Sequence, residues 1–537
     1  AGVPVPKTGA AGGPALAWLA AAAVTTFLAF PHPVAGGVLD LGLPCAFLAP
    51  ACFVLGLRGL TPRTALAVGG LTGTLAYAGV LHWIYVVTVT YGNAWPAVGV
   101  VAVLLMGAIV GAFTGTWAWA CAWLAGRGVT HPLAVAAVWV VVDHLRSFIF
   151  EGFPWGTLGY ALHADPALPG LVTVTGVYGL SFAAVAAGAA LAVWRVRRRA
   201  ALEALAVVLL LYGSGASLTA LAPPDEGPTV RVAVLQGNIG QGVKWSPDWA
   251  ERTLGIYDSL SREAAEAGAE WIVWPETAVP GSPDADLDLR ARLASLAEEV
   301  GATLVVGAVG IEGYDPVARE ARGIVRYFDS AFVWAPDGSQ GDRYDKTHLV
   351  PFGEYVPLRD FLGRFIKALA TGVSTGDVTE GARPRAISLG FSGESDTAVG
   401  VPICYELLFP DLMRRFAGDG ARALLAITND AWYGRTGAPH QFLVMTAMRS
   451  AESRLWTARA ANTGISALID ARGQVREQTE IFERRMIVGD LRLAKADAEP
   501  TFYVRHGDVF AGACWLATGV VALVGLRRNR VRRDGDE

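Results

Sequence analysis

An apolar, β-branched run that ends at a thiol decides the fold of the more polar part of this sequence: Thr397-Ala398-Val399-Gly400-Val401-Pro402-Ile403-Cys404-Tyr405-Glu406. Similar runs predict strands at 230–235, 271–274, 303–309, 324–334 and 423–427, and Asp337-Gly338 predicts a hairpin turn before 341–346. Amphipathic stretches predict helices at about 247–267, 286–300, 407–417 and 438–459. Short buried strands alternating with helices favour an α/β layered fold.

The remainder of the chain has the composition of a membrane protein. The chain of 537 residues is 53% hydrophobic, with mean hydropathy +0.39 and only 17% charged residues. Residues 1–222 carry 14 of the 92 Lys, Arg, Asp and Glu residues, so the charges concentrate after the proline-rich linker 223–228. A helix needs about 20 apolar residues to cross a bilayer core. Eight segments meet that expectation, at about 14–31, 41–57, 64–90, 97–125, 131–148, 173–194, 201–221 and 508–526.

The basic residues between these segments predict the topology. With the N-terminus in the cytoplasm, 13 Lys and Arg residues fall on the cytoplasmic side, including the runs at 195–199 and 527–533, whereas the short outer loops hold only Arg146. This is the positive-inside pattern, and it places residues 223–507 outside the cytoplasm. The first segment could also be a cleaved signal peptide; we expect a retained helix, since further spans follow at once.

These observations predict four regions: a bundle of seven transmembrane helices over 1–222, an α/β domain over 223–507, an eighth transmembrane helix over 508–526 and a basic cytoplasmic tail over 527–537. The net charge of −4 gives no indication of nucleic-acid binding. The sequence has no CxxC, HExxH or His-rich motif, so neither a metal nor a cofactor is expected.

Cys404 is the one cysteine outside the apolar, membrane-length segments that hold Cys45, Cys52, Cys121 and Cys514. A single thiol cannot form a disulfide within its domain and is too few for a cysteine metal site, which leaves a nucleophile or a buried apolar residue. The predicted helix after Cys404 would favour its thiolate.

Two further polar residues are predicted to follow strands, Glu276 in Trp274-Pro275-Glu276 and Lys346 in Tyr344-Asp345-Lys346. Sites in open α/β sheets gather beyond the carboxyl ends of strands. A glutamate can take the proton of the thiol, and a lysine together with the backbone N–H of Tyr405 can stabilise an oxyanion. The three side chains therefore predict an acyl-transfer site.

The order Trp274-Pro275-Glu276, then Lys346 ahead of Pro351-Phe352-Gly353-Glu354, then Cys404-Tyr405-Glu406 resembles the nitrilase superfamily. That resemblance implies an αββα sandwich with Glu276 as general base, Lys346 as oxyanion stabiliser, Cys404 as nucleophile and Glu354 as a second glutamate that orients the site. Tyr405 and Glu406 are implied as supporting residues, and Trp245 as a pocket residue. Plain core packing remains an alternative for Tyr405.

Further motifs extend the resemblance to most of the chain. They are Leu235-Gln236-Gly237-Asn238-Ile239, Lys244-Trp245, Gly152-Phe153-Pro154-Trp155-Gly156, Thr428-Asn429-Asp430-Ala431-Trp432-Tyr433-Gly434, Pro439-His440-Gln441 and Ala461-Asn462-Thr463-Gly464-Ile465-Ser466. With eight predicted spans, the chain resembles the apolipoprotein N-acyltransferase family. This implies acyl transfer from a membrane phospholipid, through a thioester on Cys404, to the N-terminal amine of a diacylglyceryl-cysteine lipoprotein. It also implies a bacterial inner-membrane protein, expected to be a monomer.

Some residues are expected to meet the lipid substrates. Loops 350–384 and 430–440 carry Phe352, Phe361, Phe365, Trp432 and Tyr433, which we expect to form a lid, the alternative being ordinary packing. Trp155 is also expected at the substrate. Asp143 and Arg146 share a helix face, as either a polar wall near a headgroup or an ion pair that pins the helix. A membrane-tethered amidase of the same superfamily is the alternative function.

Overall fold

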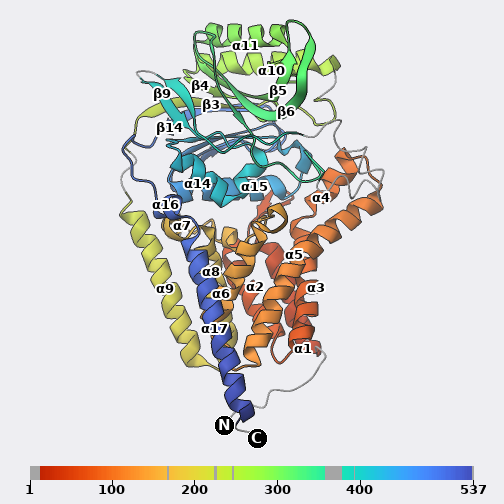
Figure 1. Cartoon of the computed structure of the whole chain (residues 1–537), viewed down its shortest axis with the longest axis vertical. Coiled ribbons are helices and arrows are strands. Elements are labelled where there is room, and N and C mark those ends of the chain that lie inside the picture. The colour runs from red at the N-terminus through yellow and green to blue at the C-terminus, as the bar shows by residue number, and fades with distance from the viewer. Residues whose placement is uncertain are drawn as a thin grey trace. The chain divides into compact units, whose positions relative to one another are not determined.

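The computed structural model describes residues 12–165, 169–222, 226–244, 247–356, 378–391 and 394–534 (Figure 1). The chain divides into two compact units. The first contains Ala1–Ala222, Arg435–Met448 and His506–Glu537, and the second contains Pro223–Gly434 and Arg449–Arg505. Residues 435–448, predicted as part of the α/β domain, thus pack with the first unit.

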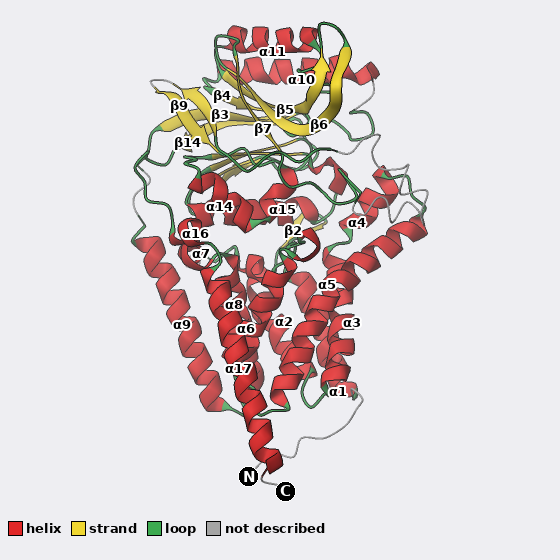
Figure 2. Cartoon of the chain, in the orientation of Figure 1, coloured by secondary structure: helices red, strands yellow, loops and turns green. Residues whose placement is uncertain are grey.

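The first unit is helical, apart from the small hairpin of β1 (His32–Val34) and β2 (Gly37–Leu39) (Figure 2). A helix overlaps each of the eight segments that the sequence predicts as spans. The helices are α1 (Gly13–Leu28), α2 (Gly42–Gly56), α3 (Pro62–Val80), α4 (Trp83–Tyr85), α5 (Pro96–Ala125), α6 (Pro132–Arg146), α7 (Pro169–Thr175), α8 (Val177–Val193), α9 (Arg198–Ala220) and α17 (Val509–Asp534).

Three of these helices are long and apolar enough to cross a membrane: α5, α9 and α17, the last over Val509–Arg528. The predicted span at 64–90 is broken, because α3 ends at Val80 and its continuation through Trp83–Tyr91 is bent by 61°. At the break, the His82 ring hydrogen-bonds the Gly79 carbonyl at 2.9 Å, and a side chain that takes a helix carbonyl favours a kink. Counted as one span, the bent pair brings the total to four, and α1, α2 and α8 are shorter apolar helices.

Glycine allows α3 and α5 to approach each other closely. Gly107, Gly111 and Gly115 recur every fourth residue on α5 and therefore share one face. A Cβ on Gly111 would lie 2.6 Å from the backbone nitrogen of Thr74, so no larger residue fits this contact without displacing α3. This is the small-residue packing by which helices associate in lipid.

The second unit contains two sheets. The first has six strands in the order β14-β3-β4-β5-β6-β7, with β3, β4 and β5 parallel and the other pairs antiparallel. The second has the order β10-β11-β12-β13, and β8 pairs with β9 in a separate hairpin. The strands are β3 (Thr229–Gln236), β4 (Trp271–Val273), β5 (Thr303–Asp315), β6 (Glu320–Trp334), β7 (Gln340–Asp345), β8 (Ile387–Phe391), β9 (Glu394–Val399), β10 (Leu424–Thr428), β11 (Thr457–Ala461), β12 (Ala467–Ile469), β13 (Val475–Gln478) and β14 (Arg485–Arg492).

The two sheets form the middle layers of a sandwich, since β11 packs against β3 and β12 against β14. Helices α10 (Pro247–Glu266) and α11 (Leu287–Val300) cover the six-stranded sheet (Figure 2). The unit also contains α14 (Pro410–Gly418), α16 (Phe502–His506) up to Arg505, and the last residues of α15 (Ala438–Ser453). The predicted layered α/β fold is therefore confirmed.

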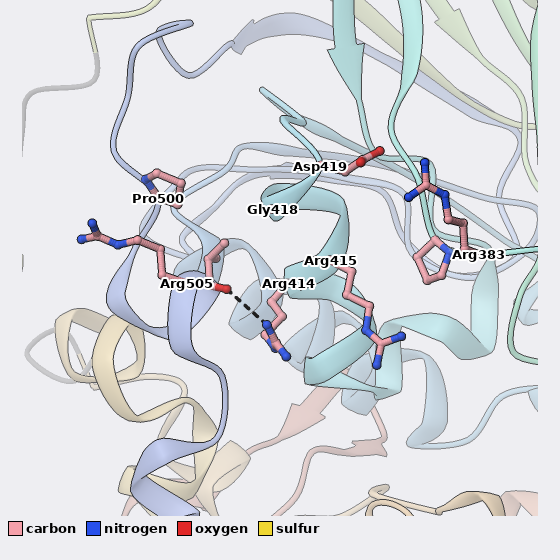
Figure 3. Close-up of a pocket in the computed structure, with 9 residues that line it drawn as sticks. Arg383, Arg414, Arg415, Gly418, Asp419, Pro500 and Arg505 are labelled. Atoms are coloured by element: carbon pink, nitrogen blue, oxygen red, sulfur yellow. Dashed lines mark hydrogen bonds between the residues drawn. The ribbon is translucent and has the colours of Figure 1, made fainter.

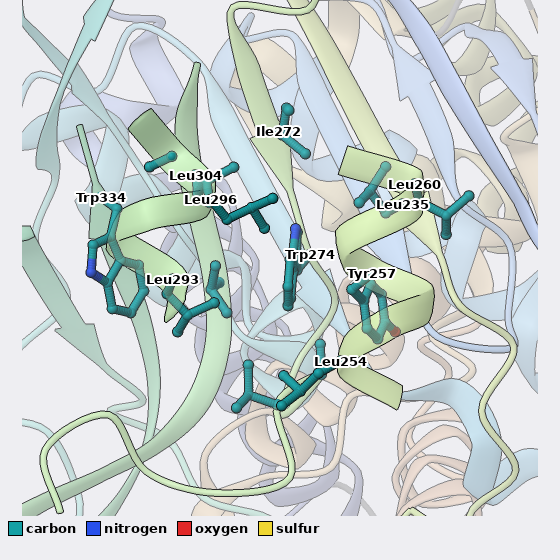
Figure 4. Packing of buried hydrophobic residues seen from close by; sticks show 14 of the residues in the cluster. Leu235, Leu254, Tyr257, Leu260, Ile272, Trp274, Leu293, Leu296, Leu304 and Trp334 are labelled. Atoms are coloured by element: carbon teal, nitrogen blue, oxygen red, sulfur yellow. The ribbon is translucent and has the colours of Figure 1, made fainter. Parts of the chain in front are cut away.

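The core between α10, α11 and the sheet fixes the end of β4 (Figure 4). Trp274 is fully buried, stacks on Tyr257 with ring centroids 4.8 Å apart, and donates its indole N–H to Ser261 at 3.0 Å. Such a buried, hydrogen-bonded tryptophan is a rigid anchor. It holds the chain two residues before Glu276.

Two predicted elements have different bounds in the structure. The helix expected over 438–459 ends at Ser453; Arg454 has φ of 55°, and residues 457–461 instead form β11, parallel to β10. The strand expected over 397–403 leaves β8 after Val399, and Gly400 and Ile403 then bridge to Leu424 and Ile427. Pro402 lies between those bridges and has no N–H to donate, which limits regular pairing there.

Candidate active site

Cys404 lies at the end of the extended segment that runs beside β10. It is buried, and its φ of 47° lies in the left-handed region that residues other than glycine rarely adopt. Thr277, which follows Glu276, has φ of 44°. Unusual backbone conformations of this kind gather at functional sites, where the surrounding fold holds them in place.

Lys346 follows β7 and is fully buried among carboxyl groups. Its Nζ donates to Glu276 Oε1 at 3.1 Å, to Asp329 Oδ2 at 3.2 Å and to Glu354 Oε1 at 2.5 Å. An ammonium has three N–H donors, so all three are engaged by these carboxyls. The structure places Glu276, Lys346 and Glu354 in one hydrogen-bonded cluster, with Asp329 as an additional member.

The carboxyl groups in this cluster titrate differently. Burial by itself would raise the pKa of Glu276, but the charge of Lys346, a hydrogen bond with Asp329 and the charge of Lys244 together lower it. Burial and the charge of Glu276 raise the pKa of Asp329 well above its usual value. Of the two carboxyl groups, Glu276 is therefore the one that ionises more readily and Asp329 the one that holds a proton more readily.

Cys404 belongs to the same electrostatic cluster. Burial raises the pKa of its thiol well above the usual value, the charge of Glu276 raises it further, and the charge of Lys346 opposes that shift. The expectation that a following helix favours the thiolate is wrong. Cys404 opens a short 3₁₀ turn, Cys404–Leu408, and α14 begins only at Pro410. The resting thiol is protonated, beside an ionised glutamate.

Glu406 joins the cysteine turn to the lysine segment. Its Oε1 accepts hydrogen bonds from the Tyr344 hydroxyl at 2.7 Å and from the Thr347 backbone N–H at 2.7 Å, and its Oε2 accepts from the Ile403 N–H at 2.8 Å. Thr347, which follows Lys346, and Ile403, which precedes Cys404, thus both donate to the carboxylate of Glu406. Glu406 joins the two segments through hydrogen bonds, and its supporting role in the reaction stays a prediction.

Tyr405 and Glu354 also contact this region. Tyr405 is buried, stacks near His348 with centroids 5.7 Å apart, and meets Phe409 edge-on at 5.2 Å. These ring contacts fit the alternative that Tyr405 is packing. Glu354 Oε2 accepts the Val350 N–H at 2.8 Å and its Oε1 accepts from Lys346, so this carboxylate links its own turn to Lys346.

The predicted lid residues differ in exposure. Phe352 and Trp432 are 49% and 39% exposed, whereas Tyr433 is buried; burial, and then the electrostatic influence of Cys404 and Asp430, raise its pKa well above the usual value. Tyr433 therefore belongs to the cysteine site. Trp245, Phe361 and Phe365 lie outside the described residues.

Trp155 and Arg146 lie in the helical unit. Arg146 is 2% exposed and donates to the carbonyls of Phe153 and Trp155, to Thr157 and, at 3.2 Å, to Asp143. Trp155 is also buried and donates its indole N–H to Gln441 at 2.7 Å. These contacts fit the ion-pair alternative: Arg146 pins the loop at 152–157 to α6.

The acidic cluster has the spacing of a cation site. One oxygen each from Glu276, Asp329 and Glu354 lie within 4.8 Å of one another. Lys346 hydrogen-bonds all three residues, so its ammonium already supplies the positive charge that these carboxyls require. The three carboxyl groups therefore form a binding site for the ammonium group of Lys346.

A cavity of about 530 Å³ has a different lining (Figure 3). Its basic residues are Arg383, Arg414, Arg415 and Arg505. Three of these arginines are paired with acids: Arg414 and Arg415 with Asp411, and Arg505 with Glu499. None of the predicted catalytic residues lines this cavity, which is separate from the cysteine site.

Comparisons with known proteins cover nearly the whole chain. The carbon-nitrogen hydrolase family matches residues 231–500, and the apolipoprotein N-acyltransferase N-terminal domain matches residues 15–190. An apolipoprotein N-acyltransferase from Geobacter metallireducens is 37% identical over 517 residues, which cover 94% of this chain and 94% of the relative. This chain belongs to the apolipoprotein N-acyltransferase family. A further member, from Pseudomonas syringae pv. tomato, is 35% identical over 474 residues and is covered to 89%. A solved carbon-nitrogen hydrolase from Helicobacter pylori G27 aligns with 49% of this chain and 89% of its own at 15% identity, with a TM-score of 0.37.

Two residues at the site of this apolipoprotein N-acyltransferase family member were not predicted to have a role. Asp329 lies within β6, where no motif marks it, and only the pairing of Ser330 with Asp345 brings it beside Lys346. Lys244 was noted in the Lys244-Trp245 motif without a function; it is 2% exposed and donates to the Glu276 carbonyl and the Thr277 hydroxyl. Lys244 is the only charged residue in the sequence between Arg231 and Asp248, and that isolation was the available signal.

Proposed function

We propose that this chain transfers a fatty acyl group from a membrane phospholipid to the N-terminal amine of a diacylglyceryl-cysteine lipoprotein, through a thioester on Cys404. The supporting observation is a buried thiol that shares its electrostatic environment with an ionised Glu276 and a charged Lys346, in a chain of this family with several apolar helices. No cofactor is required, because the thioester keeps the acyl group reactive.

In the first half-reaction, the protonated Cys404 gives its proton to Glu276 as its sulfur attacks the ester carbonyl of the phospholipid. The new C–S bond leaves a negative charge on the carbonyl oxygen. Lys346 stabilises that oxyanion through its positive charge. All three of its N–H donors bond carboxyl groups, so Lys346 must release one carboxyl partner before it can donate a hydrogen bond to the oxyanion. When the tetrahedral intermediate collapses, the ester C–O bond breaks and Glu276 returns the proton to the leaving alkoxide.

In the second half-reaction, the amine of the lipoprotein attacks the thioester. Glu276 takes a proton from the amine, the C–S bond breaks, and the proton passes to the Cys404 sulfur, which regenerates the resting thiol. The products are an amide on the lipoprotein and the free enzyme. Because both substrates use the same cysteine in turn, the kinetics are ping-pong.

Asp329 and Glu354 support Glu276 in this scheme. A protonated Asp329 donates a hydrogen bond to the Glu276 carboxylate and so favours its ionised form. Glu354 holds Lys346 from another side and is itself fixed by the Val350 N–H. Glu276 is thus a base that is ionised at neutral pH and has a defined orientation.

We also propose a membrane arrangement. Residues 1–222 and 508–526 contribute eight membrane helices, the domain 223–507 faces the extracytoplasmic side of the bacterial inner membrane, and 527–537 lies in the cytoplasm. The basic runs at 195–199 and 527–533 support this orientation. Each lipid methylene contributes about 0.8 kcal/mol to burial, so extracting a long acyl chain into water would cost over ~10 kcal/mol. A membrane-seated monomer avoids that cost, and the exposed Phe352 and Trp432 are available as lid residues.

Intact-protein mass spectrometry tests the proposal. The purified chain is incubated with phospholipid vesicles, and an added acyl mass is expected on Cys404. Cys404→Ala should remove the adduct, whereas the control Cys45→Ala, a buried cysteine of α2, should retain it. A diacylated lipopeptide should then discharge the adduct to give an N-acyl product. Loss of the adduct to water alone would instead favour the amidase, and an adduct on Cys404→Ala protein would exclude the thioester route.

A further inference from the structure

Lys244 is a buried cation that the acyl-transfer scheme leaves without a role. It follows the turn that begins at Gly240, and its side chain is 2% exposed. Its Nζ donates to the backbone carbonyl of Glu276 at 3.2 Å and to the Thr277 hydroxyl at 2.6 Å. Lys346 contacts the carboxylate of Glu276, so two lysines hold the same residue at its two ends.

The segment that Lys244 holds is conformationally demanding. Thr277 is β-branched, and at φ of 44° it lies in a region that such residues seldom adopt. The turn is also packed tightly onto β5, because a Cβ on Gly307 would lie 2.2 Å from the Pro275 carbonyl oxygen. An ammonium that bonds the carbonyl before Thr277 and the hydroxyl of Thr277 itself therefore stabilises the unusual conformation and fixes the direction of Glu276.

The charges around Lys244 show how it bears on the reaction. Burial lowers the pKa of Lys244 to about 8, although the charge of the ionised Glu276 favours its ammonium form, as a Cys404 thiolate also would. The same ammonium lowers the pKa of Glu276. All three N–H donors of Lys346 bond carboxyl groups. A second positive charge close to Cys404 therefore helps to stabilise the negative charge that develops on its sulfur during the reaction.

We propose that Lys244 is a positioning residue for acyl transfer, one whose ammonium orients Glu276 toward Cys404 and stabilises the negative charge of the first half-reaction. The inference rests on the proposed function. Lys244 keeps its proton throughout; the proton that moves is the one passing from Cys404 to Glu276. Acyl-enzyme formation should therefore need Lys244 charged and should decline as the pH rises through about 8.

The test follows the first half-reaction alone, so that the amine of the acceptor does not contribute to the pH profile. Full-length protein in detergent micelles is mixed with phospholipid, and the rate of acyl-adduct formation is measured by mass spectrometry from pH 6 to about 9.5. Wild-type protein should lose rate above about pH 8. Lys244→Met should be slower by about tenfold or more at pH 7 and should lack the decline, since one pKa unit of interaction corresponds to tenfold.

Two further variants separate this role from a general effect on folding. Thr277→Val removes one acceptor of Lys244 while keeping the side-chain shape, and it should slow acylation less than Lys244→Met does. Lys495→Met removes an exposed lysine, whose side chain is 51% exposed, and should match the wild type in rate and profile. Alkylation of Cys404 by iodoacetamide, a readout that needs no lipid, should also be slower in Lys244→Met.

The outcomes are distinguishable. If the wild type forms no adduct on Cys404, the proposed function fails. If the wild type forms the adduct and Lys244→Met forms it at the same rate with the same decline above pH 8, the role of Lys244 is refuted. If Lys244→Met loses its folded melting transition, Thr277→Val decides: an unchanged acylation rate and pH profile in that folded variant would overturn the inference.

Discussion

A buried ion pair beside the cysteine site allows a quantitative prediction. Arg459 of β11 and Asp430 are both fully buried at the side chain, and Arg459 Nη2 lies 2.8 Å from Asp430 Oδ2. Asp430 opens the 3₁₀ turn Asp430–Tyr433, and its charge raises the pKa of Cys404. Gly464 leaves no space beside the pair, because a Cβ there would lie 2.0 Å from Asp430 Oδ2. The Asp430 carboxylate is therefore closely packed against Gly464.

Arg459→Met should therefore leave a carboxylate buried without its cation. Removing one partner of a buried pair costs about 3–5 kcal/mol. For a domain of this size, each kcal/mol lowers the melting temperature by about 2–4 °C, so a decrease of about 6–20 °C is expected. Adding Asp430→Asn removes the uncompensated charge, and the double variant should recover part of the loss.

Thermal unfolding followed by intrinsic tryptophan fluorescence measures these changes. The matched control is Arg262→Met, which breaks an ion pair whose side chains are 48% and 53% exposed. Exposed pairs contribute about 0–1 kcal/mol, so the control should melt within a few degrees of the wild type. A melting temperature for Arg459→Met as high as that of Arg262→Met would refute the reasoning, as would a double variant less stable than Arg459→Met alone.

Other predictions concern Lys244 and Glu406. The folded pKa of Lys244 is about 8 against 10.5 in the unfolded chain, so the unfolded state binds more protons between these values and stability should rise with pH there. Relative to Lys244→Met, the wild type should gain about 2 kcal/mol of unfolding free energy between pH 8 and 9.5, measured by denaturant titration; parallel pH profiles would contradict this. Glu406→Gln keeps one acceptor oxygen in place of two, so either the Ile403 N–H or the donors at Oε1 lose their partner. Each unsatisfied group costs about 1–3 kcal/mol, so acyl-enzyme formation in Glu406→Gln should slow about tenfold or more. Glu320→Gln, at an exposed glutamate, is the control. Equal rates in the two variants would exclude this positioning role of Glu406.

Local sequence determined much of the fold and the chemistry of the site. Alternating apolar runs and turn residues are local properties, so they predicted the strands at 230–235, 303–309 and 324–334 and the hairpin at Asp337-Gly338. Apolar stretches of membrane length predicted where the helices of the first unit lie. Residues at strand ends, read together with a family resemblance, singled out Glu276, Lys346 and Cys404.

Tertiary structure decided what depends on distant neighbours. Asp329 joins the site only because the register of β6 against β7 places it beside Lys346, and a sequence does not display that register. Residues 457–461 form a strand because β10 offers a partner, although their local pattern continues a helix. The protonation state of Cys404 differs most from its prediction. The sequence suggested a thiolate at a helix N-terminus, whereas the fold buries the sulfur near the charge of Glu276, which favours the thiol. Burial and the approach of charges from separate strands set a pKa, and both arise only when the chain folds.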